Sequence, residues 1–183
     1  MKKQIVFIIT AIAMITGQTF AQMIKPTFGP ELAKLSFLVG HFTTRTSIMM
    51  GDNSSNGTGT IKAHWALDSM FVLFSTEEEN AALGSYKGFG ALGYYSQNSQ
   101  YVLSMFNNFG ERPEYKGNFV GDTLTLATKI ESSQGSMDQQ MKWFKDGSNV
   151  RLLIFTDFGQ GYSLVVDQTA TLSADSTKGN AGK

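Results

Sequence analysis

Residues 84–95, Gly-Ser-Tyr-Lys-Gly-Phe-Gly-Ala-Leu-Gly-Tyr-Tyr, are joined by a short polar turn to Tyr101-Val-Leu-Ser-Met-Phe106. The pattern predicts two antiparallel strands, the first of which carries Gly88, Gly90 and Gly93. Glycine weakens a strand, and several glycines in one strand mark a bulge, a bend or a close approach of the backbone. A sheet that curls until its edges meet needs such points. The segment therefore predicts a closed β-barrel.

The chain from residue 41 to residue 172 keeps a two-residue hydrophobic period, interrupted by turn residues such as Gly51-Asp-Asn-Ser-Ser-Asn-Gly57. We expect ten strands, at residues 41–50, 58–67, 70–78, 85–95, 100–109, 112–120, 122–131, 137–145, 149–158 and 161–172. One short helix is expected at residues 30–38, because Pro30 suits a first helical position. Long runs of antiparallel hairpins form sandwiches or barrels. We predict an all-β fold, a single antiparallel up-and-down barrel of about ten strands whose N-terminal helix caps one end.

The first 21 residues have the features of a secretory signal peptide. Lys2 and Lys3 precede an apolar run from Ile5 to Ile15, and Thr19-Phe-Ala21 places small residues at a cleavage site. The run is shorter than the ~20 residues that a helix needs to span a bilayer. We predict an exported protein, periplasmic or secreted, without a stable membrane span after signal cleavage. The expected domains are a barrel at residues 22–172 and a disordered tail at residues 173–183.

The composition limits the classes of partner and chemistry. The chain has no cysteine, so disulfides and cysteine nucleophiles are excluded. It has 15 basic and 15 acidic residues, and removal of Lys2 and Lys3 with the signal peptide leaves a net charge of −2. A nearly neutral chain without a basic cluster gives no electrostatic reason to bind nucleic acid. We expect no nucleic-acid partner, and the sequence leaves the oligomeric state open.

Three segments carry a resemblance to a known family: Leu35-Ser-Phe-Leu-Val-Gly40, Trp65-Ala-Leu-Asp-Ser-Met-Phe71, and Tyr86-Lys-Gly-Phe-Gly-Ala-Leu-Gly-Tyr94 with the following Tyr101-Val-Leu-Ser-Met. The chain resembles the bacterial family called domain of unknown function 1579, which is placed among lipocalin-like (calycin) barrels. Gly40-His-Phe42 is similar to the Gly-x-Trp opening of such barrels, although Phe42 replaces the tryptophan. Tyr95 stands where the family usually has an aspartate. The resemblance implies the barrel fold and, because the family has no agreed activity, implies no catalytic residue.

Few side chains are candidates for metal or cofactor chemistry. His41 and His64 fall on the polar faces of their strands, opposite each other or one pair away in a hairpin about Asp52–Asn53. Zinc takes three or four protein ligands, and a haem pocket needs an inward axial ligand. We therefore expect two solvent-facing histidines, no metal site and no cofactor. Glu77-Glu78-Glu79 is interpreted as a solvated strand end rather than a cation site.

Catalytic motifs are equally scarce. No serine stands in a Gly-x-Ser-x-Gly elbow. Gly88-Phe-Gly-Ala-Leu-Gly93 fits a G-x-G-x-x-G pattern, but no helix is expected after it, so dinucleotide binding is rejected. The sequence leaves open whether Asp157 and Asp167 face each other, as a paired-carboxylate hydrolase requires. We therefore assign no catalytic residue.

Seven apolar or amphipathic side chains are expected on inward positions of the barrel: Phe42, Trp65, Tyr115, Phe119, Met141, Trp143 and Tyr162. They either fill the barrel or wall a cavity for a small ligand, and the sequence leaves both possibilities open. We expect non-catalytic binding or transport of a small hydrophobic or amphipathic molecule, with Tyr115, Tyr162 or Arg151 orienting its polar end. Two alternatives stay open: a cofactor-free enzyme acting on a lipophilic substrate, and a protein-interaction module with a filled core.

Overall fold

The structure, a computed structural model, describes residues 27–132 and 135–174. The helix α2 (Pro30–Ala33) continues as the 3-10 helix η1 (Lys34–Leu38). The strands are β1 (Gly40–Met50), β2 (Asn53–Ala66), β3 (Phe71–Asn80), β4 (Gly84–Tyr95), β5 (Gln100–Asn107), β6 (Glu114–Val120), β7 (Thr123–Ser132), β8 (Gly135–Asp146), β9 (Asn149–Asp157) and β10 (Tyr162–Leu172). The ten expected strands and the short N-terminal helical segment are confirmed.

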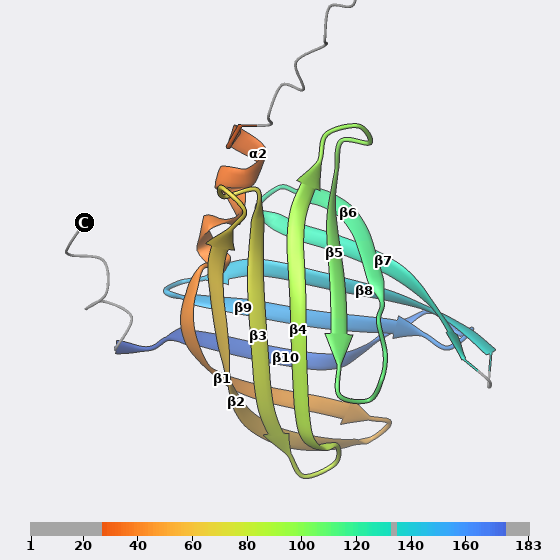
Figure 1. Cartoon of the computed structure of the whole chain (residues 1–183). Coiled ribbons are helices and arrows are strands. Elements are labelled where there is room, and N and C mark those ends of the chain that lie inside the picture. The colour runs from red at the N-terminus through yellow and green to blue at the C-terminus, as the bar shows by residue number, and fades with distance from the viewer. Residues whose placement is uncertain (1–26, 133–134, 175–183) are drawn as a thin grey trace, which may run out of the picture.

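All ten strands form one closed antiparallel barrel, shown in Figure 1. Each strand pairs with its neighbours in sequence, and β1 also pairs with β10 from Phe42↔Leu172 to Ile48↔Val166. A closed sheet has no free edge, so it offers no strand for edge-to-edge aggregation. The predicted all-β barrel is therefore the observed fold.

The glycines of β4 accommodate aromatic rings and do not form a bulge. The registers of β4 with β3 and with β5 run without a shift. A Cβ atom on Gly90 would lie 2.4 Å from Cζ of Phe74, and one on Gly93 would lie 2.7 Å from Cδ1 of Phe71. The rings of β3 therefore pack directly on the backbone of β4. The register shift of the barrel lies instead in β10, between Leu164 and Val166.

The helical segment closes one end of the barrel, at the top of Figure 1. Leu32 and Leu35 are buried in the same hydrophobic cluster as the strand residues of the core. The Tyr101 hydroxyl of β5 lies 2.8 Å from both the backbone carbonyl oxygen and Oε2 of Glu31, and it donates its proton to them. The apolar face and this hydrogen bond together fix the helical segment on the barrel.

The opposite end carries the connections β1–β2, β3–β4, β5–β6, β7–β8 and β9–β10. The first of these is tighter than expected, because Met50 already pairs with Asn53. The expected signal peptide lies outside the described residues, as does the expected tail beyond residue 174. Among the described residues, no helix has the length and apolar character needed to cross a bilayer.

Candidate ligand-binding cavity

A cavity of about 1080 Å³ occupies the barrel lumen. Its lining extends from Leu38 of η1 to Leu83 and Phe109, which lie in the turns at the opposite end of the barrel. Pockets of ~300–1,000 Å³ hold drug-sized ligands in other proteins. The volume is therefore large enough for a small molecule, and the mouth lies at the end away from the helix.

Apolar side chains of β1, β2, β3, β8, β9 and β10 form much of the wall: Phe42, Ile61, Phe74, Met141, Trp143, Leu152, Ile154 and Val166. Phe74 and Trp143 meet edge to face, with ring centroids 6.1 Å apart. Such a pair is favourable because the positive ring edge meets the negative ring face. The wall suits the apolar part of a ligand, which gains about 25 cal/mol per Å² of buried area before the costs of association.

One group of polar side chains interrupts the apolar wall, and we call it the lumen cluster: Thr46 of β1, Glu78 of β3 and Gln168 of β10. The Thr46 hydroxyl donates to Oε2 of Glu78 over 2.7 Å. Nε2 of Gln168 donates to the same Oε2 and to Oγ1 of Thr46, each over 2.9 Å. All three residues are at most 7% exposed. Buried polar groups need such partners to offset their lost hydration.

A second polar group lies on the other side of the lumen. The Tyr115 hydroxyl of β6 donates to Oε1 of Gln139 on β8, and Nε2 of Gln139 donates to Oγ1 of Thr156 over 3.2 Å. Burial raises the pKa of Tyr115 above its ordinary value of 10.0. Its phenol therefore stays protonated at neutral pH and acts as a hydrogen-bond donor.

Four of the seven expected lumen residues line the cavity: Phe42, Tyr115, Met141 and Trp143. The other three, Trp65, Phe119 and Tyr162, do not line it, for two different reasons. Trp65 and Phe119 lie in the closed end. Tyr162 lies on the outer surface.

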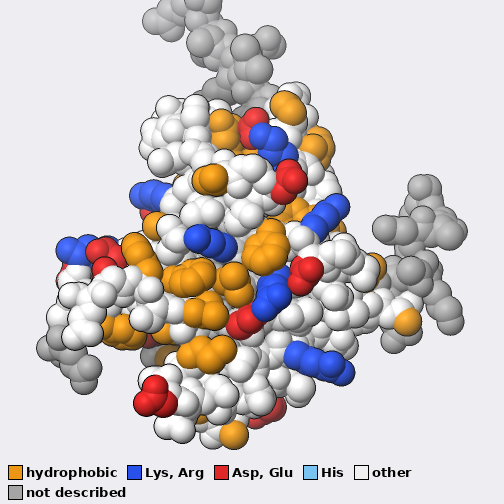
Figure 2. Space-filling model, turned by 180° about the vertical axis from the view of Figure 1, so that it is seen from behind, with side chains coloured by type: hydrophobic (Ala, Val, Ile, Leu, Met, Phe, Trp, Pro, Cys, Tyr) orange, Lys and Arg blue, Asp and Glu red, His pale blue; other side chains and the backbone are white. Residues whose placement is uncertain are grey.

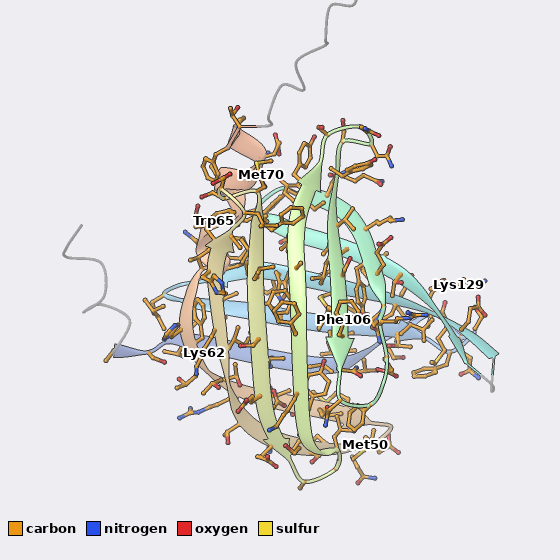
Figure 3. The ribbon with its side chains drawn as sticks, in the orientation of Figure 1. Met50, Lys62, Trp65, Met70, Phe106 and Lys129 are labelled. Atoms are coloured by element: carbon orange, nitrogen blue, oxygen red, sulfur yellow. The ribbon has the colours of Figure 1, made fainter. Side chains whose placement is uncertain are left out.

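Trp65 and Phe119 belong to the packing between the helical segment and the barrel. The Trp65 indole meets Phe28 edge to face at 5.2 Å, and Figure 3 shows it near Met70 at the helix end. Phe119 meets Phe37 at 6.4 Å and Tyr101 at 5.3 Å. These rings seal the end of the barrel instead of lining the hollow part. Both rings therefore lie outside the lining of the cavity described here.

Tyr162 and Arg151 were expected to orient a polar end of the ligand, and both lie on the outer face. Tyr162 is 52% exposed and pairs with Asp157, before the register shift in β10. Arg151 donates from Nε and Nη2 to the two carboxylate oxygens of Asp167, over 2.9 and 2.6 Å. Neither residue lines the cavity. Of the three candidates, Tyr115 alone is a lining residue of the cavity described here.

The two histidines are exposed on the outer face, as expected. His41 pairs with Lys62, and the hairpin turns at Gly51-Asp52, so His64 lies two residues beyond the partner of His41. Within the described ranges, no three His, Cys, Asp or Glu side chains gather where they could hold a metal ion. Neither histidine lines the lumen.

Asp157 and Asp167 do not form a pair of facing carboxylates. Oδ1 of Asp157 accepts from the backbone N–H groups of Gly159, Gln160 and Gly161, at 2.7–3.0 Å, and so shapes the β9–β10 turn. Asp167 is held by Arg151. Because of these hydrogen bonds and this ion pair, the two aspartates have structural roles in the described part of the chain.

Figure 2 shows the barrel from behind, with hydrophobic side chains gathered among charged ones.

Glu78 lies inside the lumen, although the sequence interpretation placed it at a solvated strand end. Glu77 and Glu79 are exposed as expected, but Glu78 is 7% exposed and lines the lumen. It shares its side of β3 with Val72, Phe74 and Thr76, and side chains two residues apart point to the same face of a strand. The alternation of β3 could have predicted this inward position. It was overlooked because Glu78 stands between two other acids, Glu77 and Glu79.

The closed antiparallel barrel with its helical segment at one end fits the class of lipocalin-like barrels. The crystal structure of Rv2717c from M. tuberculosis is similar to it, with a TM-score of 0.57 over 80% of this chain and 99% of that chain. The two sequences are 14% identical, so the likeness concerns the fold alone. No family model matches the sequence, and no curated protein matches it either.

Proposed function

We propose that this protein binds a small hydrophobic or amphipathic molecule in the barrel lumen, without catalysing a reaction on it. The observation that carries the proposal is the cavity of about 1080 Å³ with its largely apolar strand wall. An apolar hollow of this size is unfavourable to leave in contact with water, and a ligand with matching apolar surface removes that contact. The lumen cluster and Tyr115 supply a few polar groups that fix orientation, as in other ligand pockets.

The proposal also includes the location of the protein and its family. The pattern of residues 1–21 supports export to the periplasm or the medium. The three sequence segments that resemble domain of unknown function 1579 support membership of that family. The pattern of residues 1–21 suits a carrier that meets its ligand outside the cytoplasm, and the family resemblance supports the barrel fold alone.

Binding of the uncharged fluorophore N-phenyl-1-naphthylamine to the full chain, purified after export, tests the proposal. Ile154 faces the lumen, and the adjacent Leu153 faces outward, where it pairs with Asp167. We expect saturable binding with a blue shift, at least about tenfold weaker in Ile154→Trp because the larger side chain fills the cavity. The matched control Leu153→Trp keeps the wild-type affinity. Absence of binding to the wild-type protein, or equal loss in both variants, contradicts a lumen site.

The alternative of a cofactor-free enzyme rests on Glu78 and Tyr115, which are titratable side chains inside the lumen. The raised pKa of Tyr115 makes its phenolate a poor candidate for a base at neutral pH. Mass spectrometry of a bound lipophilic compound before and after prolonged incubation separates the two functions. A carrier returns the compound unchanged, whereas a new product mass establishes turnover.

A further inference from the structure

A pair of glycines on β2 allows polar side chains of other strands to meet inside the barrel. Gly57 and Gly59 have the same parity along β2 as Ile61 and Ala63, which line the cavity. Gly59 pairs with Thr44 of β1 on one side and with Glu78 of β3 on the other. A Cβ atom there would lie 2.8 Å from Cα of Glu78. No side chain of β2 intervenes at this level, so Glu78 reaches across β2 to β1 and β10.

The hydrogen bonds that the Glu78 side chain accepts from the described residues involve only one of its two carboxylate oxygens. Thr46 and Gln168 both donate to Oε2, whereas the hydrogen bonds of the described residues supply no donor to Oε1. The neighbouring Thr44 is 2% exposed, and its Oγ1 has no hydrogen-bond partner among the described residues. The site therefore retains acceptor capacity, which a donor group of a ligand can use.

The charge of the site is also uncompensated. None of the ion pairs between described residues includes Glu78. The charged lining residues are Glu78, Glu111, Glu114 and Glu131 against Arg112 and Lys129. At the mouth, Lys129 lies 3.7 Å from Glu131, and Glu114 lies 2.8 Å from Lys116. These pairs leave Glu78 and Glu111 against one cation, Arg112, among the charged lining residues. An anion entering this lumen meets net negative charge, and like charges in such surroundings repel strongly.

The position of the lumen cluster gives a ligand its direction. Glu78 lies two residues before the end of β3 at the mouth. Phe74 lies four residues earlier on the same strand, nearer the closed end, and contacts Trp143 on the opposite wall. A polar head at Glu78 therefore leaves an apolar chain free to extend toward the closed end. This is the orientation that buries the most apolar surface while it keeps the head near solvent.

We propose that the lumen ligand is an amphiphile with a cationic amine head group, which is held by Glu78 while its apolar chain lies against Phe74 and Trp143. This inference rests on the proposed binding function and names the class of ligand. The ammonium group donates to Glu78 and supplies the positive charge that the described residues do not provide there. A fatty acid, in contrast, brings a second carboxylate to the same place.

Competition against N-phenyl-1-naphthylamine with three ligands of equal chain length tests the inference: dodecylamine, dodecanol and dodecanoate, each below its micelle concentration at neutral pH. We expect the exported wild-type protein to bind dodecylamine at least about tenfold more tightly than dodecanoate, with dodecanol between them. Glu78→Gln should remove this preference while dodecanol binding persists. The matched control Glu79→Gln changes an exposed acid one residue away and should keep the preference.

The possible failures are distinguishable. If none of the four compounds binds, the proposed lumen function itself is wrong. If dodecanoate binds as well as dodecylamine, or if Glu78→Gln keeps the preference, the lumen binds ligands but the cationic head group is wrong. The order of the three ligands on the wild-type protein decides this even when Glu78→Gln fails to fold.

Discussion

Phe74 of β3 and Trp143 of β8 touch across the lumen, with ring centroids 6.1 Å apart and ring planes at 86°. Four strands separate β3 from β8 in either direction around the barrel, so the two rings come from opposite walls. Their contact joins the two halves of the sheet and borders the cavity. The same pair therefore serves stability and shapes the space available to a ligand.

Truncation of this pair should destabilise the barrel. Trp143 is 9% exposed, and we expect Trp143→Ala to lower the free energy of unfolding by about 3 kcal/mol, as for other large aromatic residues in cores. Phe74→Ala combined with it should add less than its own effect, because both substitutions remove the same contact. Urea denaturation measures both quantities. Phe106→Ala, at a 53% exposed position labelled in Figure 3, is the control and should change stability by less than about 0.5 kcal/mol.

The glycines of the barrel should differ in their tolerance of a methyl group. On Gly59 a Cβ would lie 2.2 Å from the backbone oxygen of Glu77, whereas on Gly90 it would lie 2.4 Å from the tip of the Phe74 ring. A ring can move, but a paired backbone cannot without a change in the sheet. We expect Gly59→Ala to cost about 3 kcal/mol and Gly90→Ala about 1 kcal/mol in urea denaturation. The reverse order would show that the β2–β3 backbone adjusts more easily than the aromatic packing.

The hydrogen bond from Tyr101 to Glu31 should hold the helical segment on the barrel. Tyr101 is 1% exposed, and Tyr101→Phe removes the donor without a change in ring packing. We expect a loss of about 1 kcal/mol in the free energy of unfolding. Tyr95→Phe removes a hydroxyl that donates to Gln97 on the surface, at a 46% exposed position, and should have a smaller effect. Equal effects would contradict an anchoring role for the Tyr101 hydroxyl.

Acid should weaken the attachment of the same helical segment. The hydrogen bond from Lys34, followed by that from Tyr101, lowers the pKa of Glu31 below its ordinary value of 4.5. A carboxyl group with a lowered pKa in the folded state stabilises the fold above its unfolded-state pKa, and this stabilisation is lost as the pH falls through the folded-state pKa. The difference in melting temperature between the wild-type protein and Glu31→Gln should therefore shrink on acidification. Lys34→Met should reduce that pH dependence, and an unchanged dependence would contradict the assignment to this pair.

Several features of this protein could be predicted from the sequence. The two-residue period and the turn residues between its runs indicate ten strands and one short helix, because the face of a strand is set by local geometry. The alternation also places Phe42, Tyr115, Met141 and Trp143 on inward positions, and these residues do line the cavity. The exposed histidines follow from the same alternation.

Other features depend on how the barrel closes. The register shift between Leu164 and Val166 reverses the faces of β10, and for this reason Tyr162 points outward although it has the parity of the inward Val166 and Gln168. Trp65 and Phe119 are inward as well, but Phe28, just before the helical segment, and Phe37, within it, cover them. Their separation from the cavity depends on where that segment docks, which no local pattern contains.

The sequence by itself determined the strands, their alternation and the short helical cap, because these follow from contacts between residues close along the chain. Only the tertiary structure decided that the lumen is hollow and that the Glu78 carboxylate lies within it. A hollow depends on the summed volume of side chains from distant strands. The place of Glu78 depends on Gly59 and Thr46, which lie on the two preceding strands, and on Gln168, which the β1–β10 pairing brings to its side.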